Sequence, residues 1–247
     1  MNSILNIAAY KFVPLADLAG FKATLTAQTE ARQLKGTILI AEEGINLFLA
    51  AGKESIHDFL GWLKSDGRFS DLWAKESWSD HQPFKKMRIK IKSEIIRMNH
   101  PTIRPQAGRA PSVTPGELNR WLDQGHDDNG REVVLLDTRN AFEVSHGSFK
   151  GAVDFGIGKF SDFPQAFRDH ASALEGKTIV SFCTGGIRCE KAAIYMRSIG
   201  HPYAFQLEGG ILNYFEKTDA RHYRGDCFVF DDRALLDPQL AVSPHAK

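Results

Sequence analysis

Residues 178–193 read TIVSFCTGGIRCEKAA, and this stretch decides the fold of the C-terminal half of the chain. Its first five residues are mostly apolar, as expected of a strand that is buried on both faces of a parallel sheet. Cys183 follows directly, and a glycine pair then leads into a helical pattern from about Cys189. In open parallel sheets, ligands bind at the carboxyl ends of the strands. We therefore expect a functional site at Cys183.

The loop after this strand predicts an anion-binding site around a cysteine thiolate. Adjacent glycines let backbone N–H groups point inward, and the next helix adds the positive end of its dipole. With the charge of Arg188, such surroundings lower the pKa of a thiol toward or below neutrality. We predict that Cys183 is a thiolate at pH 7 and that Arg188 orients toward the anion; the alternative is an inert buried cysteine. The anion-binding loop itself comprises Thr184, Gly185, Gly186 and Ile187.

The rest of the C-terminal half alternates strands and helices. Val133 to Leu136 is a second apolar run, and Thr114-Pro115-Gly116-Glu117 combines a helix N-cap, a first-position proline and a third-position glutamate. Helical patterns also cover 163–170, 189–198 and 211–216. The alternation predicts an α/β fold with a doubly wound parallel sheet.

The N-terminal half shows the order β-α-β-β-α-β, which predicts a smaller ferredoxin-like α+β domain. The expected strands are 4–13, 37–40, 45–49 and 86–96, and the expected helices are 14–34 and 55–64. Between the halves, residues 99–111 hold three prolines and a glycine that disfavour regular structure. We predict one domain over 1–98, a linker over 99–111, a second domain over 112–220 and a tail over 221–247. From Gly225 onward the tail lacks a clear hydrophobic periodicity, and we expect its polar end to be mobile.

Composition limits the function classes. The chain has 247 residues, 43% of them hydrophobic and 25% charged, with a net charge of +1, which is typical of a globular protein. Three cysteines do not suit a disulfide framework, and neither a signal peptide nor an apolar run of about 18 residues occurs. We expect a cytoplasmic protein without a membrane segment. The sequence does not indicate an oligomeric state.

The loop resembles the active-site loop of rhodanese domains. Upstream, Asp137-Thr138-Arg139, Glu143, Gly147 and Gly151-Ala152 are similar to the rhodanese pattern, and Gly209-Gly210 matches its end. Ser148 replaces the histidine of that pattern, so no role is transferred to it. The fuller strings CTGGIRCEKA, LLDTRN, GGILNYFE and GDCFVFDDR resemble the rhodanese-domain, oxygen-dependent tRNA uridine-34 hydroxylase family over nearly the whole chain.

The resemblance implies conversion of the wobble uridine of tRNA to 5-hydroxyuridine with molecular oxygen as co-substrate. The anticodon stem-loop would bind across both domains, with Cys183 as the catalytic cysteine and Arg188 beside it. Cys189 is a candidate resolving thiol or a packing residue, and Asp137 and Arg139 are candidates to brace the loop. Cys227 is expected to be structural, and Glu143 to pack and cap a helix.

Three other functions remain open. A sulfurtransferase would hold a persulfide on Cys183. A phosphatase is disfavoured because rhodanese-like phosphatases have a loop one residue longer than the one that ends at Arg188. The third alternative is an RNA-binding module without catalysis. Scattered histidines offer no ligand set for iron, and no dinucleotide fingerprint occurs, so no metal or cofactor is identified.

A basic stripe in the N-terminal half predicts RNA binding. Lys86, Arg88, Lys90 and Lys92 alternate with apolar residues and share one face of the expected strand. Basic stripes of this kind bind phosphates. The alternative is a solvated edge strand whose lysines prevent aggregation. Just before the stripe, Trp73, Trp78 and Phe84 are candidates to stack on unpaired bases.

Overall fold

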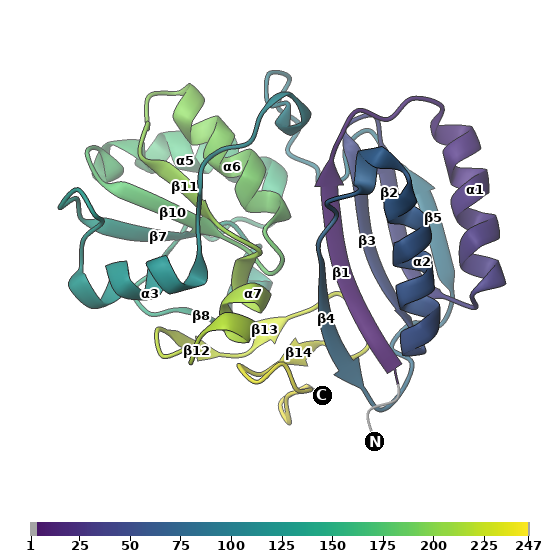
Figure 1. The fold of residues 1–247 in the computed structure, drawn as a ribbon. Helices are drawn as coiled ribbons and strands as arrows, with labels where there is room; N and C mark the ends of the chain where they lie inside the picture. The colour runs from purple at the N-terminus through teal and green to yellow at the C-terminus, as the bar shows by residue number, and fades with distance from the viewer. Residues whose placement is uncertain (1–3, 247) are drawn as a thin grey trace. The chain divides into compact units, whose positions relative to one another are not determined.

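The computed structural model describes residues 4–246, and the chain divides into two compact units, each with its own sheet (Figure 1). Among the described residues, unit 1 runs to Ile96 and also includes Phe230–Arg233. Unit 2 comprises Arg97–Val229 and the residues from Ala234 onward. Residues 99–111, predicted as a linker, contain the short 3-10 helix Pro105–Ala107.

Unit 1 is an α+β sandwich in which two helices cover one face of a five-stranded sheet (Figure 1). The strand order is β4-β1-β3-β2-β5, with antiparallel pairing except between β2 and β5. The first six major elements follow the predicted β-α-β-β-α-β order. They are β1 (Ile4–Phe12), α1 (Leu18–Ala31), β2 (Lys35–Ala41), β3 (Gly44–Ala51), α2 (Lys53–Ser65) and β4 (Ala74–Ser79), followed by β5 (Met87–Ile91).

Two details of this half differ from the sequence prediction. The sixth element is β4, whose sequence AKESWS has no apolar alternation to reveal it. The segment 86–96, predicted as the sixth element, instead forms the extra edge strand β5. This strand pairs with β2 and ends at Ile91 rather than at residue 96. Helix α1 begins at Leu18 rather than at Pro14, because the Asp17 carboxylate accepts the Gly20 N–H at 3.0 Å and caps it there.

The core of unit 1 lies between the sheet and its helices. Helix α2 buries Ile56, Phe59, Leu60 and Leu63, the four residues that its helical spacing places on one face. On the sheet, Ile38 and Ile40 alternate inward along β2 and are fully buried. This packing leaves β5 at the sheet edge, with Met87 and Ile89 against the core.

Unit 2 has a parallel sheet with helices on both faces, as predicted (Figure 1). Its order is β6-β11-β10-β7-β9, and every pairing is parallel. Central strand β10 is buried along its whole length, as expected for a strand covered on both sides. The strands are β6 (Ser112–Val113), β7 (Val133–Asp137), β9 (Val153–Asp154), β10 (Thr178–Phe182) and β11 (Ala204–Leu207). The helices are α3 (Pro115–Gln124), α4 (Ala141–Val144), α5 (Phe163–His170), α6 (Ile187–Ser198) and α7 (Gly210–Lys217).

The C-terminal segment, predicted as a tail over 221–247, contains short paired strands that its sequence pattern does not indicate. Strand β12 (Tyr223–Gly225) pairs with β8 (Gly147–Phe149), and β13 (Cys227–Phe228) pairs with β14 (Leu235–Leu236). Strands this short show no period in the sequence. The turn between β13 and β14 belongs to unit 1, where Arg233 donates to Ser77 Oγ at 2.7 Å. No helix within residues 4–246 is both long enough and apolar enough to cross a bilayer.

Candidate active site

Cys183 lies where β10 ends and α6 begins. Gly186, at the N-cap of α6, has φ of 96°, a conformation that glycine adopts without steric cost. Its N–H donates to Cys183 Sγ at 3.1 Å. The helix starts at Ile187, two residues earlier than predicted, which places Arg188 and Cys189 in its first turn. Cys183 is fully buried, with backbone amides directed at its sulfur.

The surroundings of Cys183 stabilise its thiolate. Burial alone would raise the pKa of this thiol, because desolvation disfavours the charged form. A hydrogen bond from Cys189, the charge of Arg188 and the nearby backbone amides outweigh burial and lower the pKa to about 5. This lowering of the Cys183 pKa is the shift that the loop sequence predicts.

Cys189 is a hydrogen-bond donor to the Cys183 thiolate. It is fully buried, and both burial and the adjacent thiolate raise its pKa well above its ordinary value. It therefore keeps its proton near neutral pH. A second polar group, Thr138 Oγ1, lies 4.0 Å from Cys189 Sγ. The structure thus gives Cys189 a supporting contact with the loop cysteine.

The Arg188 side chain is paired with a carboxylate close to the loop. Its Nη1 and Nη2 bind the two carboxylate oxygens of Glu143 at 2.6 and 2.7 Å, and both side chains are buried. Burial opposes the charge of Arg188, but the bond to Glu143 raises its pKa above the ordinary value. The guanidinium therefore remains charged and acts on Cys183 through space.

Glu143 is the partner that sequence reasoning missed, although its capping role is confirmed. Its Oε2 accepts the Asn140 N–H at 3.1 Å, at the start of α4, while the same carboxylate binds Arg188. One buried carboxylate thus joins α4 to α6. The only sequence signal is a glutamate in the rhodanese-like string upstream of the loop.

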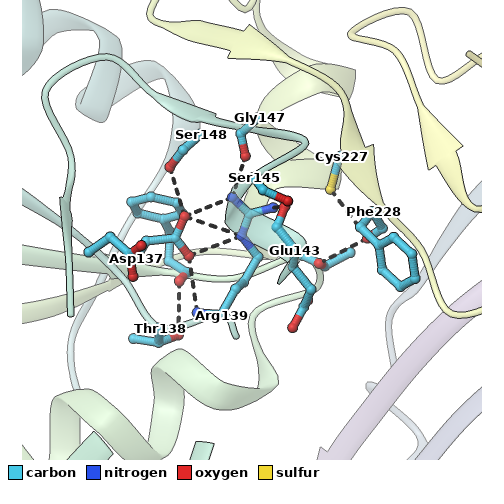
Figure 2. Close-up of polar contacts among 12 residues, drawn as sticks. Asp137, Thr138, Arg139, Glu143, Ser145, Gly147, Ser148, Cys227 and Phe228 are labelled. Atoms are coloured by element: carbon cyan, nitrogen blue, oxygen red, sulfur yellow. Dashed lines mark hydrogen bonds and ion pairs between the residues drawn. The ribbon is translucent and has the colours of Figure 1, made fainter. Parts of the chain in front are cut away.

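Asp137 and Arg139 brace the end of β7 (Figure 2). Arg139 Nη2 donates to Asp137 Oδ2 at 2.7 Å and to the carbonyl of Gly147 at 2.6 Å. Ser148, for which no role was predicted, donates to Asp137 Oδ2 at 2.7 Å. Burial opposes the charge of Arg139, but Asp137 raises its pKa above the ordinary value. Thr138 Oγ1 donates to the Phe182 carbonyl at 2.9 Å, which links this brace to the residue before Cys183.

Helix α7 holds the loop carbonyls. The N–H of Ile211 donates to the Cys183 carbonyl at 2.9 Å, and that of Leu212 to the Thr184 carbonyl at 3.1 Å. Because α7 holds the carbonyls of Cys183 and Thr184, the backbone amides of the loop are directed toward the Cys183 sulfur. Gly210, at φ of 68°, lets α7 approach this closely: a Cβ there would lie 2.3 Å from the Cys183 oxygen and 2.7 Å from the Gly186 nitrogen.

Strand β13 lies over the loop. Thr184 Oγ1 donates to the Phe228 carbonyl at 3.3 Å, and the Cys227 thiol donates to the same carbonyl at 3.8 Å (Figure 2). Burial raises the pKa of Cys227 to about 12, so it stays protonated. These contacts agree with a structural role for Cys227.

The basic stripe lies in unit 1, whereas the cysteine loop lies in unit 2. Its four basic side chains are exposed on and beside edge strand β5. Ile91, expected on the apolar face, is 44% exposed because β5 ends there. Of the predicted stacking residues, Trp78 packs against the core and Phe84 is half-buried, while Trp73 is exposed with Lys75 Nζ 4.7 Å from its ring centroid. Within residues 4–246, no three His, Cys, Asp or Glu side chains are grouped to hold a metal.

Comparison with known proteins defines the class. Residues 4–95 match the UPF0176 acylphosphatase-like domain, and residues 114–217 match the rhodanese-like domain. The chain is therefore a two-domain protein that joins an acylphosphatase-like domain to a rhodanese-like domain.

Full-length relatives define the family within this class. A tRNA uridine(34) hydroxylase of Delftia acidovorans is 59% identical over 100% of this chain and 94% of its own length. One from Bordetella pertussis is 59% identical over 98% of this chain and 99% of its own length. The chain belongs to the tRNA uridine(34) hydroxylase family.

Proposed function

We propose that this protein hydroxylates uridine 34 of tRNA at C5, using molecular oxygen, and that Cys183 is its nucleophile. The observation that carries the proposal is the Cys183 sulfur at the end of β10, which accepts the Gly186 N–H at 3.1 Å in a chain of this family. A thiolate at neutral pH is the reactive form of cysteine. We place the protein in the cytoplasm, where tRNA acts and where free thiols such as its three cysteines persist.

The chemistry uses the thiolate to activate the base. Sulfur adds to C6 of uracil, and the electron pair of the C5–C6 double bond moves onto the C5–C4 enolate. Oxidation at C5, loss of the C5 proton and cleavage of the sulfur–C6 bond then restore the ring. One atom of O2 enters the product and the other leaves as water, so an external reductant supplies two electrons and, with solvent, two protons. Because Cys183 is fully buried, the base reaches it only when covering side chains move.

The other site residues support this nucleophile. We assign Arg188, through its positive charge, and Cys189, through its hydrogen bond, to stabilisation of the Cys183 thiolate. Asp137 and Arg139 fix the end of β7, the strand that pairs with β10 just before the loop. The anion-binding segment from Thr184 to Ile187 supplies backbone amides, as Gly186 already does.

The basic stripe is our candidate contact for the phosphates of the anticodon stem-loop. Replacing Lys86, Arg88, Lys90 and Lys92 together by glutamine should weaken tRNA binding. Each phosphate contact contributes about 0.7–0.9 to the slope of log affinity against log salt, so the slope should flatten by roughly 2 to 4. Fluorescence anisotropy of a labelled stem-loop at several salt concentrations measures both effects.

A matched control removes four exposed lysines elsewhere. Lys22, Lys53, Lys64 and Lys159 are exposed, and their replacement by glutamine changes the net charge equally. If both quadruple variants lose the same affinity, the effect is one of net charge and the stripe is not the binding site.

The rhodanese-like match over residues 114–217 favours one alternative, a sulfurtransferase with a persulfide on Cys183. In that reaction, thiosulfate transfers its outer sulfur to the thiolate with release of sulfite, and cyanide removes that sulfur as thiocyanate and regenerates the thiolate. Formation of thiocyanate at rates typical of an enzyme, dependent on Cys183, would support this function.

The proposed function is tested by mass spectrometry of tRNA nucleosides from cells with and without the protein. The proposal predicts that 5-hydroxyuridine and its derivatives are lost with the protein and return when it is supplied again. Unchanged levels in cells that contain no second enzyme of this activity would refute the proposal.

A further inference from the structure

An aromatic group lies beside the catalytic loop, and we propose that it stacks against an unpaired base of the anticodon loop next to uridine 34. The group, here called the aromatic rim, consists of Phe142, His146 and Phe228. This inference rests on the proposed function and adds a substrate-positioning surface to it.

The rim is a cluster of rings that is open to solvent. The centroids of Phe142 and Phe228 lie 5.2 Å apart at an interplanar angle of 84°, and those of His146 and Phe228 lie 5.9 Å apart at 20°. Phe142 is 48% exposed, His146 is exposed and Phe228 is half-buried. A large exposed phenylalanine packed against other rings offers a flat apolar face.

The rim is fixed to the same residues that shape the loop. Phe142 precedes Glu143 in α4, so successive side chains of this helical turn point in different directions: Glu143 is buried against Arg188, and Phe142 is exposed. On the other side, the Phe228 carbonyl accepts the hydroxyl of Thr184, the residue after Cys183. The rim is therefore connected to the loop through Glu143 and through Thr184.

An unpaired base fits this surface better than a protein side chain does. A uridine that leaves its stack to reach a buried thiolate loses stacking energy, and single-stranded RNA is recognised by stacking on aromatic rings. A cation suited to phosphate binding also lies nearby. Exposed Arg224 is on β12, and the next residue, Gly225, pairs with Gly147, which follows His146 in the chain. An aromatic face with a nearby cation is the usual combination in single-strand binding.

The test compares Phe142→Leu with Phe142→Tyr in the full-length protein. The probe is an anticodon stem-loop that carries the fluorescent base 2-aminopurine next to the wobble uridine. Stacking on the rim predicts quenching by the unaltered protein. Phe142→Leu should lose the quenching and weaken binding by about tenfold or more, and Phe142→Tyr should retain both. Tyr203→Leu removes another exposed aromatic ring of unit 2 and should change neither.

The result that overturns the inference is equal affinity and quenching in Phe142→Leu and the unaltered protein. That outcome would instead favour a protein partner for the rim. A loss that Phe142→Tyr does not restore would also overturn it, because stacking requires only the flat ring. Failure of the proposed function is distinguishable: unaltered protein would then form no 5-hydroxyuridine in cells, whatever residue stands at position 142.

Discussion

Cys183→Ser should abolish formation of 5-hydroxyuridine while leaving the fold intact. A serine hydroxyl does not ionise near neutral pH, so the hydrogen bond from Gly186 and the charge of Arg188 have no anion to stabilise. Loss of an enzyme nucleophile reduces turnover by at least about a thousandfold. Nucleoside mass spectrometry of tRNA from cells that produce only the variant measures the effect.

The matched control is Cys227→Ser, which changes another fully buried cysteine of unit 2. Its thiol donates to a backbone carbonyl, a contact that a hydroxyl can also make. Cys227→Ser should therefore keep most of the hydroxylation. If Cys183→Ser tRNA still contains normal amounts of 5-hydroxyuridine, the proposed role of the loop is wrong.

Gly210→Ala should also cause a large loss of activity, although the three atoms nearest to the added Cβ all belong to backbone. The new Cβ would lie 2.3 Å from the Cys183 oxygen and 2.7 Å from the Gly186 nitrogen, so α7 and the loop must move apart. The Gly186 N–H then no longer lies within hydrogen-bond distance of the Cys183 sulfur. We expect the pKa of Cys183 to rise and the level of 5-hydroxyuridine to fall by roughly a hundredfold.

Gly151→Ala separates this effect from simple backbone strain. Gly151 has φ of 72°, close to the 68° of Gly210, but no atom lies within 4 Å of its added Cβ. Both variants should lose about 1–2 kcal/mol of unfolding free energy from the left-handed conformation. Only Gly210→Ala should change the pKa of Cys183. Equal activities of the two variants would show that the contact of α7 with the loop has no functional role.

The loop could be predicted from sequence because its determinants are consecutive. An apolar run, a cysteine, two glycines and an arginine fix the strand end, the turn and the helix start locally. Two of its long-range contacts could not be predicted in this way. The partner of Arg188 is 45 residues earlier in the chain, and the glycine that lets α7 approach is 27 residues after Cys183.

The same contrast holds for the fold. Long amphipathic helices such as α2 and buried strands such as β10 can be recognised in the sequence by their hydrophobic period and length. Strand β4 cannot be recognised in this way, since its evidence is the pairing with β1 and the packing of the partly buried Trp78 against the core. The aromatic rim was missed for a related reason. Two of its rings are exposed, and the third, Phe228, lies in a two-residue strand that shows no hydrophobic period.

The most direct test of the account is a pH titration of the Cys183 thiol. Ultraviolet absorbance of the thiolate, taken as the difference between the unaltered protein and Cys183→Ser, follows its ionisation. The lowered pKa means that the thiolate persists above the midpoint and is lost as the pH falls through about 5. Removing the Cys189 hydrogen bond with Cys189→Ala should move the midpoint upward. A midpoint near about 5 in the unaltered protein is the predicted result, and one at about 8.5, the value of an ordinary thiol, would contradict the account.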